Sequence, residues 1–250
     1  QVDMNPDRIG LTKKVTVGIA GDAKQVALQI LEKLSSNAGD NGREERKNLI
    51  HQTKSAWLQT LTSLDHEDDD PGTVWNKEAR ERDKDRMSPR QAWRAIQAAM
   101  PEDAIISSDI GNNCAIGNAY PMFEKPRKYL APGLFGPCGY GFPSILGAKI
   151  GCPDTPVIGF AGDGAFGISM NEMSSCAREE WPAITMVIFR NYQWGAEKRN
   201  SILWFDDNFV GTELDPELSY AKVANACGLK GVTVNTMEET TKAIKPVSYT

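Results

Sequence analysis

The sequence predicts an α/β fold, a doubly wound parallel sheet, and three observations support that prediction. Short apolar runs recur at residues 104–107, 157–161 and 184–189, as expected of strands that are buried on both faces. The stretches between these runs contain Gly-rich turns and patterns with helical spacing. Small or polar residues follow each run, at the place where open parallel sheets bind ligands. Strands that alternate with helices in this way form a parallel sheet covered by helices.

Residues 1–38 predict the C-terminal remnant of a Rossmann-like central domain. The run at 15–20 favours a strand, and the spacing over 23–34 favours an amphipathic helix. We interpret Gly21-Asp22 between them as a plain strand-to-helix turn, because no second Gly and no suitably placed Asn follow it. The chain also opens without an initiator Met, inside a strand-like segment, so we expect it to be a fragment.

Residues 39–87 differ in composition and are interpreted as a helical interdomain linker. Apolar residues recur at helical spacing between residues 43 and 64, which predicts one amphipathic helix. An acidic stretch at 66–72 and a polar connector at 77–86 follow. We interpret the acidic stretch as a solvated loop rather than a metal site.

The second predicted domain, residues 88–250, begins with a clear helix start signal. Ser88 can cap the helix, Pro89 suits its first position, and Gln91 completes a capping box. Trp93 and Ile96 then fall on one face of the helix, with Met100. A strand at 104–107 follows, and it ends in the loop 108–113.

Composition narrows the possible functions. The net charge of −5 gives no electrostatic case for nucleic acid or an anionic membrane, and no apolar run is long enough to span a bilayer. The chain has five scattered cysteines without a CxxC pair, which favours reduced thiols in a cytoplasmic protein. The two histidines, His51 and His66, lie outside the motif region and argue against a histidine triad or a zinc site there.

The most informative motif is Gly162-Asp163-Gly164, which is followed one predicted helix and one predicted strand later by Asn191. The two glycines permit a tight turn and a close approach of the backbone to phosphate. Asp163 and Asn191 both follow strands of the same parallel sheet, so their side-chain oxygens can meet at its carboxyl edge. Mg²⁺ prefers such oxygen ligands, and the backbone carbonyl of Gln193 is placed to supply a third. The sequence therefore predicts a magnesium site that holds a diphosphate.

Three segments together resemble the diphosphate-binding part of thiamine diphosphate enzymes of the acetolactate synthase/pyruvate decarboxylase superfamily. These segments are the loop 110–113, the segment 136–143, and the GDG motif with Ala165 and Asn191. The resemblance runs through about Glu239, after which the tail 240–250 departs from the family's last helix and strand. It implies the thiamine diphosphate-binding fold, with thiamine diphosphate and Mg²⁺ as cofactors.

The resemblance also implies individual roles. The Gly136 carbonyl accepts a hydrogen bond from the cofactor's aminopyrimidine, and Cys138 stands where the family usually has a Met, Leu or Ile that bends the cofactor. A redox or nucleophilic role of Cys138 is an alternative. Tyr192 follows the metal ligand where the family more often has a second Asn. The implied cofactor-binding residues are Ile110, Gly111, Asn112, Asn113, Gly136, Cys138, Gly162, Gly164 and Ala165, and the implied metal ligands are Asp163, Asn191 and Gln193.

Within the superfamily, residues 136–143 and 190–200 most resemble the sulfoacetaldehyde acetyltransferases, enzymes of taurine degradation. This implies conversion of sulfoacetaldehyde and phosphate to acetyl phosphate and sulfite. An acetolactate synthase-like or sulfopyruvate decarboxylase-like enzyme of 2-oxo acids is the alternative. A nicotinamide dehydrogenase is disfavoured because no G-x-G-x-x-G opens a helix. A non-catalytic module is a further alternative, against which the intact Asp163 and Asn191 count.

The resemblance leaves the catalytic residues unknown, because the family's activating Glu belongs to a pyrimidine-binding domain that has no counterpart here. We therefore expect a homo-oligomer, a dimer or a tetramer, that supplies this domain, with small-molecule substrates and with neither nucleic acid nor membrane as partner. Both expected substrates are anions, so Arg190, Lys198 and Arg199 are candidate contacts, with ordinary surface cations as the alternative. Trp194 is interpreted as a packing residue.

Overall fold

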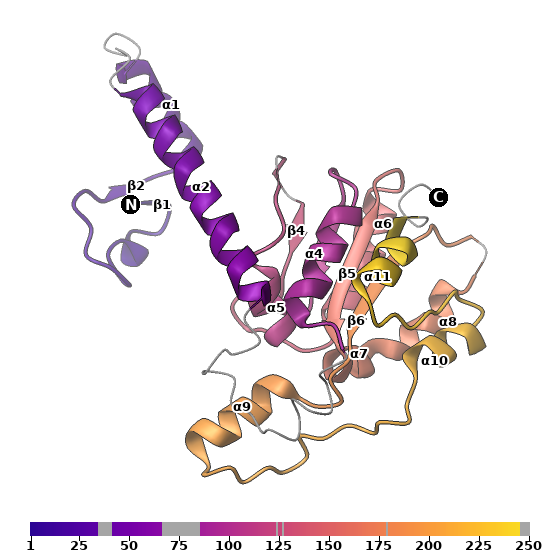
Figure 1. The fold of residues 1–250 in the computed structure, drawn as a ribbon. Helices are drawn as coiled ribbons and strands as arrows, with labels where there is room; N and C mark the ends of the chain where they lie inside the picture. The colour runs from indigo at the N-terminus through magenta and orange to yellow at the C-terminus, as the bar shows by residue number, and fades with distance from the viewer. Residues whose placement is uncertain (35–41, 67–85, 124, 127, 179, 246–250) are drawn as a thin grey trace. The chain divides into compact units, whose positions relative to one another are not determined.

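A computed structural model describes residues 1–34, 42–66, 86–123, 125–126, 128–178 and 180–245. The chain divides into two compact units, Gln1–His66 and Glu67–Thr250 (Figure 1). The predicted domain boundaries at 38 and 87 stay predictions. Of the expected acidic loop at 66–72 and the expected connector at 77–86, residues 67–72 and 77–85 lie outside the described residues, and His66 belongs to α2.

The first unit contains a small parallel sheet and two long helices. Its elements are β1 (Val2–Asp3), the 3₁₀ helix η1 (Pro6–Arg8), β2 (Ile19–Ala20), α1 (Ala23–Leu34) and α2 (Arg43–His66). The predicted strand at 15–20 forms only over its last two residues. The reason is that β1 offers just two partners, with Val2 opposite Ile19 and Asp3 opposite Ala20. Both predicted helices are present.

The second unit is built on a four-stranded parallel sheet. Its strands are β3 (Ile105–Ser108), β4 (Tyr129–Leu130), β5 (Val157–Gly162) and β6 (Thr185–Phe189), in the spatial order β4-β3-β5-β6. All three pairings are parallel, as the sequence predicts. The prediction of a strand buried on both faces was wrong for β6, which is half-buried along its length because it lies at the edge of the sheet.

Helices cover both faces of this sheet. On one face, α4 and α11 pack side by side (Figure 1). The indole of Trp93 on α4 lies 4.4 Å from the ring of Phe160 and 5.5 Å from that of Phe189, measured between centroids. On the other face, α6 and α7 bury Ile145 and Phe166 against the alternate residues of β5. The helices of this unit are α4 (Pro89–Ala99), α5 (Asn112–Gly117), α6 (Gly141–Gly151), α7 (Asp163–Ser169), α8 (Met173–Cys176), α9 (Gly195–Trp204), α10 (Tyr220–Ala226) and α11 (Met237–Ile244).

Local capping signals position the helices that flank the site. The Ser88 hydroxyl accepts the Gln91 backbone N–H at 3.1 Å, and the Gln91 side chain accepts the Ser88 N–H at 2.9 Å, which confirms the predicted capping box. The helix predicted after the GDG motif begins within the motif itself, at Asp163, as α7, and it continues through the 3₁₀ helix η3 (Met170–Glu172) into α8. The turn motif itself therefore forms the first turn of α7.

The C-terminal segment adds a helix that the sequence did not predict. Within the tail at 240–250, Thr240 and Ile244 belong to α11 and are buried, and α11 packs on α4. Residues 246–250 lie outside the described part. Across the described residues, every helix is too short or too polar to cross a membrane.

Candidate functional site

The candidate site lies where the strand order of the second unit reverses. After β3 the chain moves to β4 on one side, and it then returns to β5 on the other side of β3. Open α/β sheets bind ligands at such a switch point, outside the carboxyl ends of the strands. The loop after β3 and the turn after β5 meet there, together with the loop after β6, as the sequence predicts.

Asp163 anchors the turn after β5 and is 2% exposed. Its Oδ1 accepts the N–H of Gly164 at 3.0 Å, and its Oδ2 accepts the N–H groups of Asn191 at 3.1 Å and Tyr192 at 2.7 Å. Burial raises the pKa of Asp163 above its ordinary value, against the lowering effect of these N–H donors. The carboxylate thus ties the end of β5 to the loop that follows β6.

Three oxygen-bearing groups converge after β5 and β6, namely the Asp163 carboxylate, the Asn191 amide and the Gln193 carbonyl. One terminal atom of the Asn191 amide lies 3.2 Å from Asp163 Oδ1 and 2.9 Å from the carbonyl oxygen of Gln193. As a nitrogen, this atom would donate a hydrogen bond to both oxygens. As an oxygen, it would face only acceptors, which is favourable when a cation lies between the three groups. A 180° rotation of the amide interconverts the two arrangements, so the donor set fits a hard divalent cation such as Mg²⁺.

Glycines permit the close packing of this turn. A Cβ on Gly164 would lie 2.8 Å from the indole of Trp194, so Trp194 packs directly on the turn. A Cβ on Gly195 would lie 2.9 Å from the amide of Asn191 and 3.1 Å from that of Asn112. Asn112 and the loop after β6 therefore approach one another at Gly195.

The other predicted cofactor residues are distributed over the same edge. In the loop after β3, Gly111 has a φ of +117°. Asn112 and Asn113, predicted to be part of this loop, instead begin α5, and the Asn113 amide donates to the carbonyl of Asp109 at 3.2 Å. Asn113 is buried, whereas Asn112 is exposed. In the turn after β5, Ala165 is buried and Gly162 is half-buried. The structure thus brings the three predicted segments to one edge, with the exposed Asn112 and Asn191 among them.

The segment 136–141 lies next to the loop after β3. Gly136 and Gly139 have φ values of +63° and +85°, which favour glycine, and a Cβ on Gly136 would lie 3.5 Å from the Ile110 side chain. Cys138 is exposed as a residue. Partial burial of its sulfur, followed by the negative charges of Asp109 and Glu197, raises the pKa of the Cys138 thiol. A raised pKa disfavours the thiolate that a nucleophilic role would need.

Sequence reasoning missed Asp109, the residue that joins these segments. It follows β3 directly and is fully buried. Its Oδ1 accepts the N–H groups of Ile110 at 2.9 Å and Gly139 at 3.0 Å, and its Oδ2 accepts that of Gly141 at 2.7 Å. The one available signal was its position, because it follows a predicted strand at the same place as Asp163 follows the next.

Tyr192 sits between two of the predicted metal ligands in an unusual conformation. Its φ is +61°, which is uncommon for a residue with a side chain. The guanidinium carbons of Arg190 and Arg86 lie 4.4 Å and 5.1 Å from its ring centroid. Arg190 also donates to the carbonyl of Pro216 at 2.8 Å. Arg190 thus braces the loop after β6, and its predicted contact with substrate stays a prediction.

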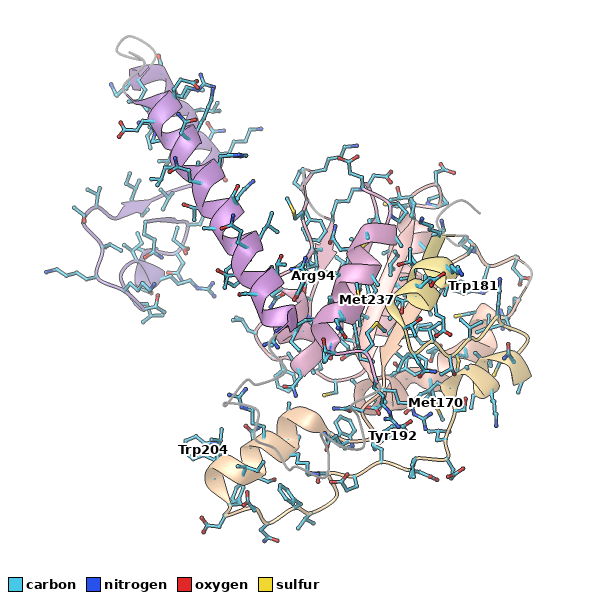
Figure 2. All side chains as sticks on the ribbon, viewed as in Figure 1. Arg94, Met170, Trp181, Tyr192, Trp204 and Met237 are labelled. Atoms are coloured by element: carbon cyan, nitrogen blue, oxygen red, sulfur yellow. The ribbon has the colours of Figure 1, made fainter. Side chains whose placement is uncertain are left out.

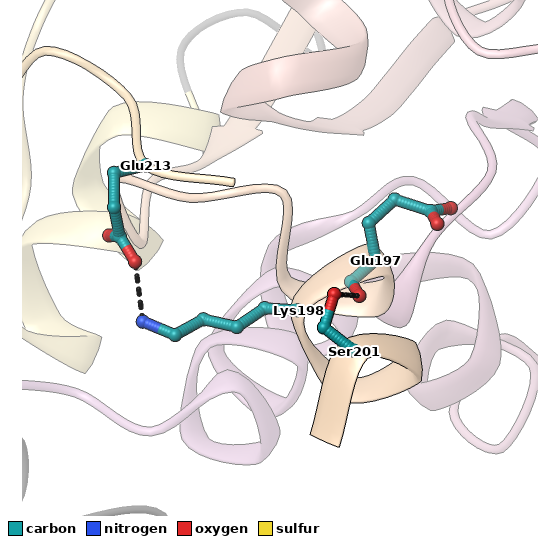
Figure 3. Close-up of polar contacts among 4 residues, drawn as sticks. All are labelled: Glu197, Lys198, Ser201 and Glu213. Carbon is teal, nitrogen blue, oxygen red and sulfur yellow. Dashed lines mark hydrogen bonds and ion pairs between the residues drawn. The ribbon is translucent and has the colours of Figure 1, made fainter. Parts of the chain in front are cut away.

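The loop after β6 continues into α9 and returns at residues 212–214. The Trp194 N–H donates to Thr212, and the Leu214 N–H donates to Tyr192. Lys198 forms an ion pair with Glu213 across this return (Figure 3), and its ammonium lies 5.0 Å from the Phe209 ring. Lys198 thus braces this return, Arg199 is exposed, and the predicted substrate contacts of both residues stay predictions. Trp204 projects from the end of α9 and is 75% exposed (Figure 2).

A family model described as "Thiamine pyrophosphate enzyme, C-terminal TPP binding domain" matches residues 109–248. The match continues past Glu239, so the resemblance extends further than expected from the sequence, in agreement with the helix α11. It begins at Asp109 and contains all the predicted cofactor and metal residues.

Curated relatives and a solved structure agree with this match. The chain is 78% identical to a probable sulfoacetaldehyde acetyltransferase of Rhizobium meliloti (strain 1021), over 98% of this chain and 41% of the relative. It is 72% identical to a sulfoacetaldehyde acetyltransferase of Roseovarius nubinhibens, over 98% of this chain and 40% of the relative. A thiamine diphosphate-dependent 4-hydroxybenzoylformate decarboxylase of Rhodococcus jostii RHA1 superposes with a TM-score of 0.60 at 26% identity, covering 65% of this chain and 30% of that one.

The chain spans about two fifths of the length of these curated relatives. The part it spans includes the strand ends, the GDG turn and the oxygen-bearing groups described above. The chain therefore belongs to the thiamine pyrophosphate enzymes, and its residues 109–248 are their C-terminal TPP-binding domain.

Proposed function

We propose that this chain is the diphosphate-binding part of a sulfoacetaldehyde acetyltransferase, which depends on thiamine diphosphate and Mg²⁺. Such an enzyme converts sulfoacetaldehyde and phosphate to acetyl phosphate and sulfite. The observation that supports the proposal most strongly is the convergence of Asp163 Oδ1, the Asn191 amide and the Gln193 carbonyl at the end of two parallel strands. The relatives at 78% and 72% identity, which are named as a probable sulfoacetaldehyde acetyltransferase and a sulfoacetaldehyde acetyltransferase, support the substrate.

In this proposal each group of residues has a distinct task. Asp163, Asn191 and the Gln193 carbonyl would hold Mg²⁺, and the loop 110–113 and the first turn of α7 would hold the diphosphate with backbone N–H groups. The segment 136–141 would hold the organic rings. Bound thiamine diphosphate supplies the electron sink for the chemistry, while the protein orients it and excludes water.

The substrates are expected to reach this site in a larger assembly. The curated relatives are more than twice as long as this chain, and the activating Glu of the superfamily is expected outside it. We propose that a homo-oligomer supplies that residue, with cytoplasm as the compartment. This part alone should bind the cofactor without turnover, so activity of the isolated 250 residues would contradict the proposal.

Cofactor binding tests the metal site directly. Titration calorimetry with thiamine diphosphate should give binding that requires Mg²⁺, and Asp163→Ala should abolish it because the anchoring carboxylate is lost. Asp154→Asn is the matched control, since Asp154 is an exposed carboxylate after α6. Mg²⁺-dependent binding that persists in Asp163→Ala would rule out this metal site.

Product analysis of the complete enzyme tests the reaction. Incubation with sulfoacetaldehyde should release sulfite and form acetyl phosphate only when phosphate is present. Carbon dioxide release from a 2-oxo acid, without sulfite release from sulfoacetaldehyde, would instead support the alternative 2-oxo acid enzyme.

A further inference from the structure

We propose that Asp109 is a positioning residue that holds the segment 136–141 against the loop 110–113. We call this connection the lock, because it fixes the position of the two segments relative to one another where the cofactor is expected to bind. The proposal rests on the proposed function for the identity of the ligand. The contacts that define the lock are independent of it.

The geometry of the carboxylate supports a lock rather than a ligand role. Among the described residues, Asp109 accepts three close backbone N–H groups, those of Ile110 and Gly139 at Oδ1 and that of Gly141 at Oδ2, and the N–H of Tyr140 also faces the carboxylate. Hydrogen bonds from such donors favour the ionised form, because a carboxyl proton would face a donor. Full burial excludes water as a substitute partner. Each N–H is therefore held by the same rigid side chain.

Close packing and a second set of hydrogen bonds reinforce the same junction. A Cβ on Gly141 would lie 3.0 Å from Asp109 Cβ and 3.1 Å from its backbone nitrogen, so the first turn of α6 touches the end of β3. The hydroxyls of Ser107 and Ser144 are hydrogen-bonded, and Ser144 Oγ donates to the Gly141 carbonyl at 2.9 Å. The N-terminus of α6 is thus fixed to β3 from two sides.

The junction lies between the residues expected to hold the two ends of the cofactor. Ile110 begins the loop on the diphosphate side, and its side chain lies close to Gly136 on the other side. Cys138 directly precedes Gly139, the first of the two glycines that Asp109 binds, and the negative charge of Asp109 contributes to the raised pKa of its thiol. Displacement of Gly139 and Gly141 would therefore shift the wall of the cofactor site.

Asp109→Asn provides a selective test. Asparagine can keep its oxygen at the Oδ1 position, where two N–H groups bind, but its NH₂ group must then face the N–H of Gly141. Hydrogen exchange of the full chain without cofactor should show the Gly141 amide exchanging about tenfold faster, with little change at Gly139. Thiamine diphosphate affinity with Mg²⁺ should fall about tenfold, because the wall of the site loses its fixed position.

Ser108→Ala is the matched control. Ser108 is equally buried at the end of β3, but its hydroxyl donates to the Asp109 backbone carbonyl at 3.1 Å and leaves the carboxylate untouched. It should lower stability without changing Gly141 exchange or cofactor affinity. If Asp109→Asn fails to fold, Gly141→Ala disturbs the same contact from the side of the segment.

The outcomes separate this proposal from the proposed function. An unchanged rate of amide hydrogen exchange at Gly141 in Asp109→Asn would overturn the lock. If Ser108→Ala lost as much affinity for thiamine diphosphate as Asp109→Asn does, Asp109 would only stabilise the fold and would not position the cofactor site. Failure of the unaltered chain to bind thiamine diphosphate would overturn the cofactor assignment instead. The exchange rates at Gly139 and Gly141 would still decide whether the carboxylate couples the two segments.

Discussion

Two glycines of one helix should respond in opposite directions to the same substitution. Gly141 opens α6, and a Cβ there would lie 3.0–3.1 Å from three atoms of Asp109, of which the backbone nitrogen and Cβ cannot rotate away. Gly147 lies in the interior of α6, is exposed, and would place its Cβ in open space. The pair therefore separates the cost of a clash from the benefit of replacing glycine in a helix.

The magnitudes follow from the two environments. Overpacking at Gly141 should lower the free energy of unfolding by about 1–3 kcal/mol, because α6 must move away from β3. Gly147→Ala should raise it by about 0.4–1 kcal/mol, through the lower entropy of the unfolded chain and the better helix propensity. A difference of about 2 kcal/mol corresponds to a shift of about 4–8 °C in the melting temperature of a unit this large.

Urea denaturation followed by circular dichroism and tryptophan fluorescence measures both variants against the unaltered chain. Gly141→Ala should also weaken thiamine diphosphate binding, whereas Gly147→Ala should not. Equal stability of the two variants would refute the close approach of α6 to Asp109. Destabilisation by Gly147→Ala would refute the open space assigned to that position.

Other contacts around the site give further expectations. Tyr220→Phe removes the hydroxyl that donates to the Asp163 carbonyl at 2.7 Å, so the free energy of unfolding should fall by about 1 kcal/mol in urea titrations, and a fall below about 0.3 kcal/mol would contradict this contact. Burial raises the pKa of Asp109 in the folded state, so folding takes up a proton at pH values between the ordinary pKa and the raised pKa. As pH falls through that window, the unaltered chain should gain stability relative to Asp109→Asn, and it should lose this gain as pH rises. Urea titrations from about pH 7 to about pH 4 check this sign. In the ion pair of half-buried Lys198 with exposed Glu213, the Glu213 side chain is open to solvent, so a double-mutant cycle should give a coupling of about 0.2–1 kcal/mol that weakens in high salt, and a salt-independent coupling would contradict it.

Local signals in the sequence were sufficient for most of the framework. The Ser88 capping box depends on residues three positions apart, and the structure forms it as predicted. The GDG turn and Asn191 were predictable because each directly follows an apolar strand of a parallel sheet. Their convergence requires only that the two strands be neighbours, which the alternation of strands and helices already implies.

The features that escaped prediction depend on partners far away in the chain. Apart from its position after a predicted strand, nothing in the sequence distinguishes Asp109 from other carboxylates. Its role depends on hydrogen bonds from Gly139 and Gly141, which lie 30 and 32 residues further along the chain. The exposure of β6 depends on its edge position, which periodicity does not encode. The positive φ of Tyr192 occurs where the backbone N–H groups of Asn191 and Tyr192 both donate to Asp163 Oδ2, a partner 28 and 29 residues earlier in the chain.

The two buried carboxylates, Asp109 and Asp163, accept the same pattern of backbone hydrogen bonds but have different neighbours. Asp109 and Asp163 each follow one of two neighbouring strands, and each accepts three backbone N–H groups, including that of the next residue and those of a distant loop. Both oxygens of Asp109 face donors alone, whereas Oδ1 of Asp163 also faces the amide of Asn191 beside the Gln193 carbonyl. Of these two carboxylates, only that of Asp163 has, among the described residues, oxygen-bearing neighbours that can share a cation. Because the proposed metal position depends on Asp163 and the proposed opposite wall of the site on Asp109, each carboxylate can be removed separately to test which half of the site fails.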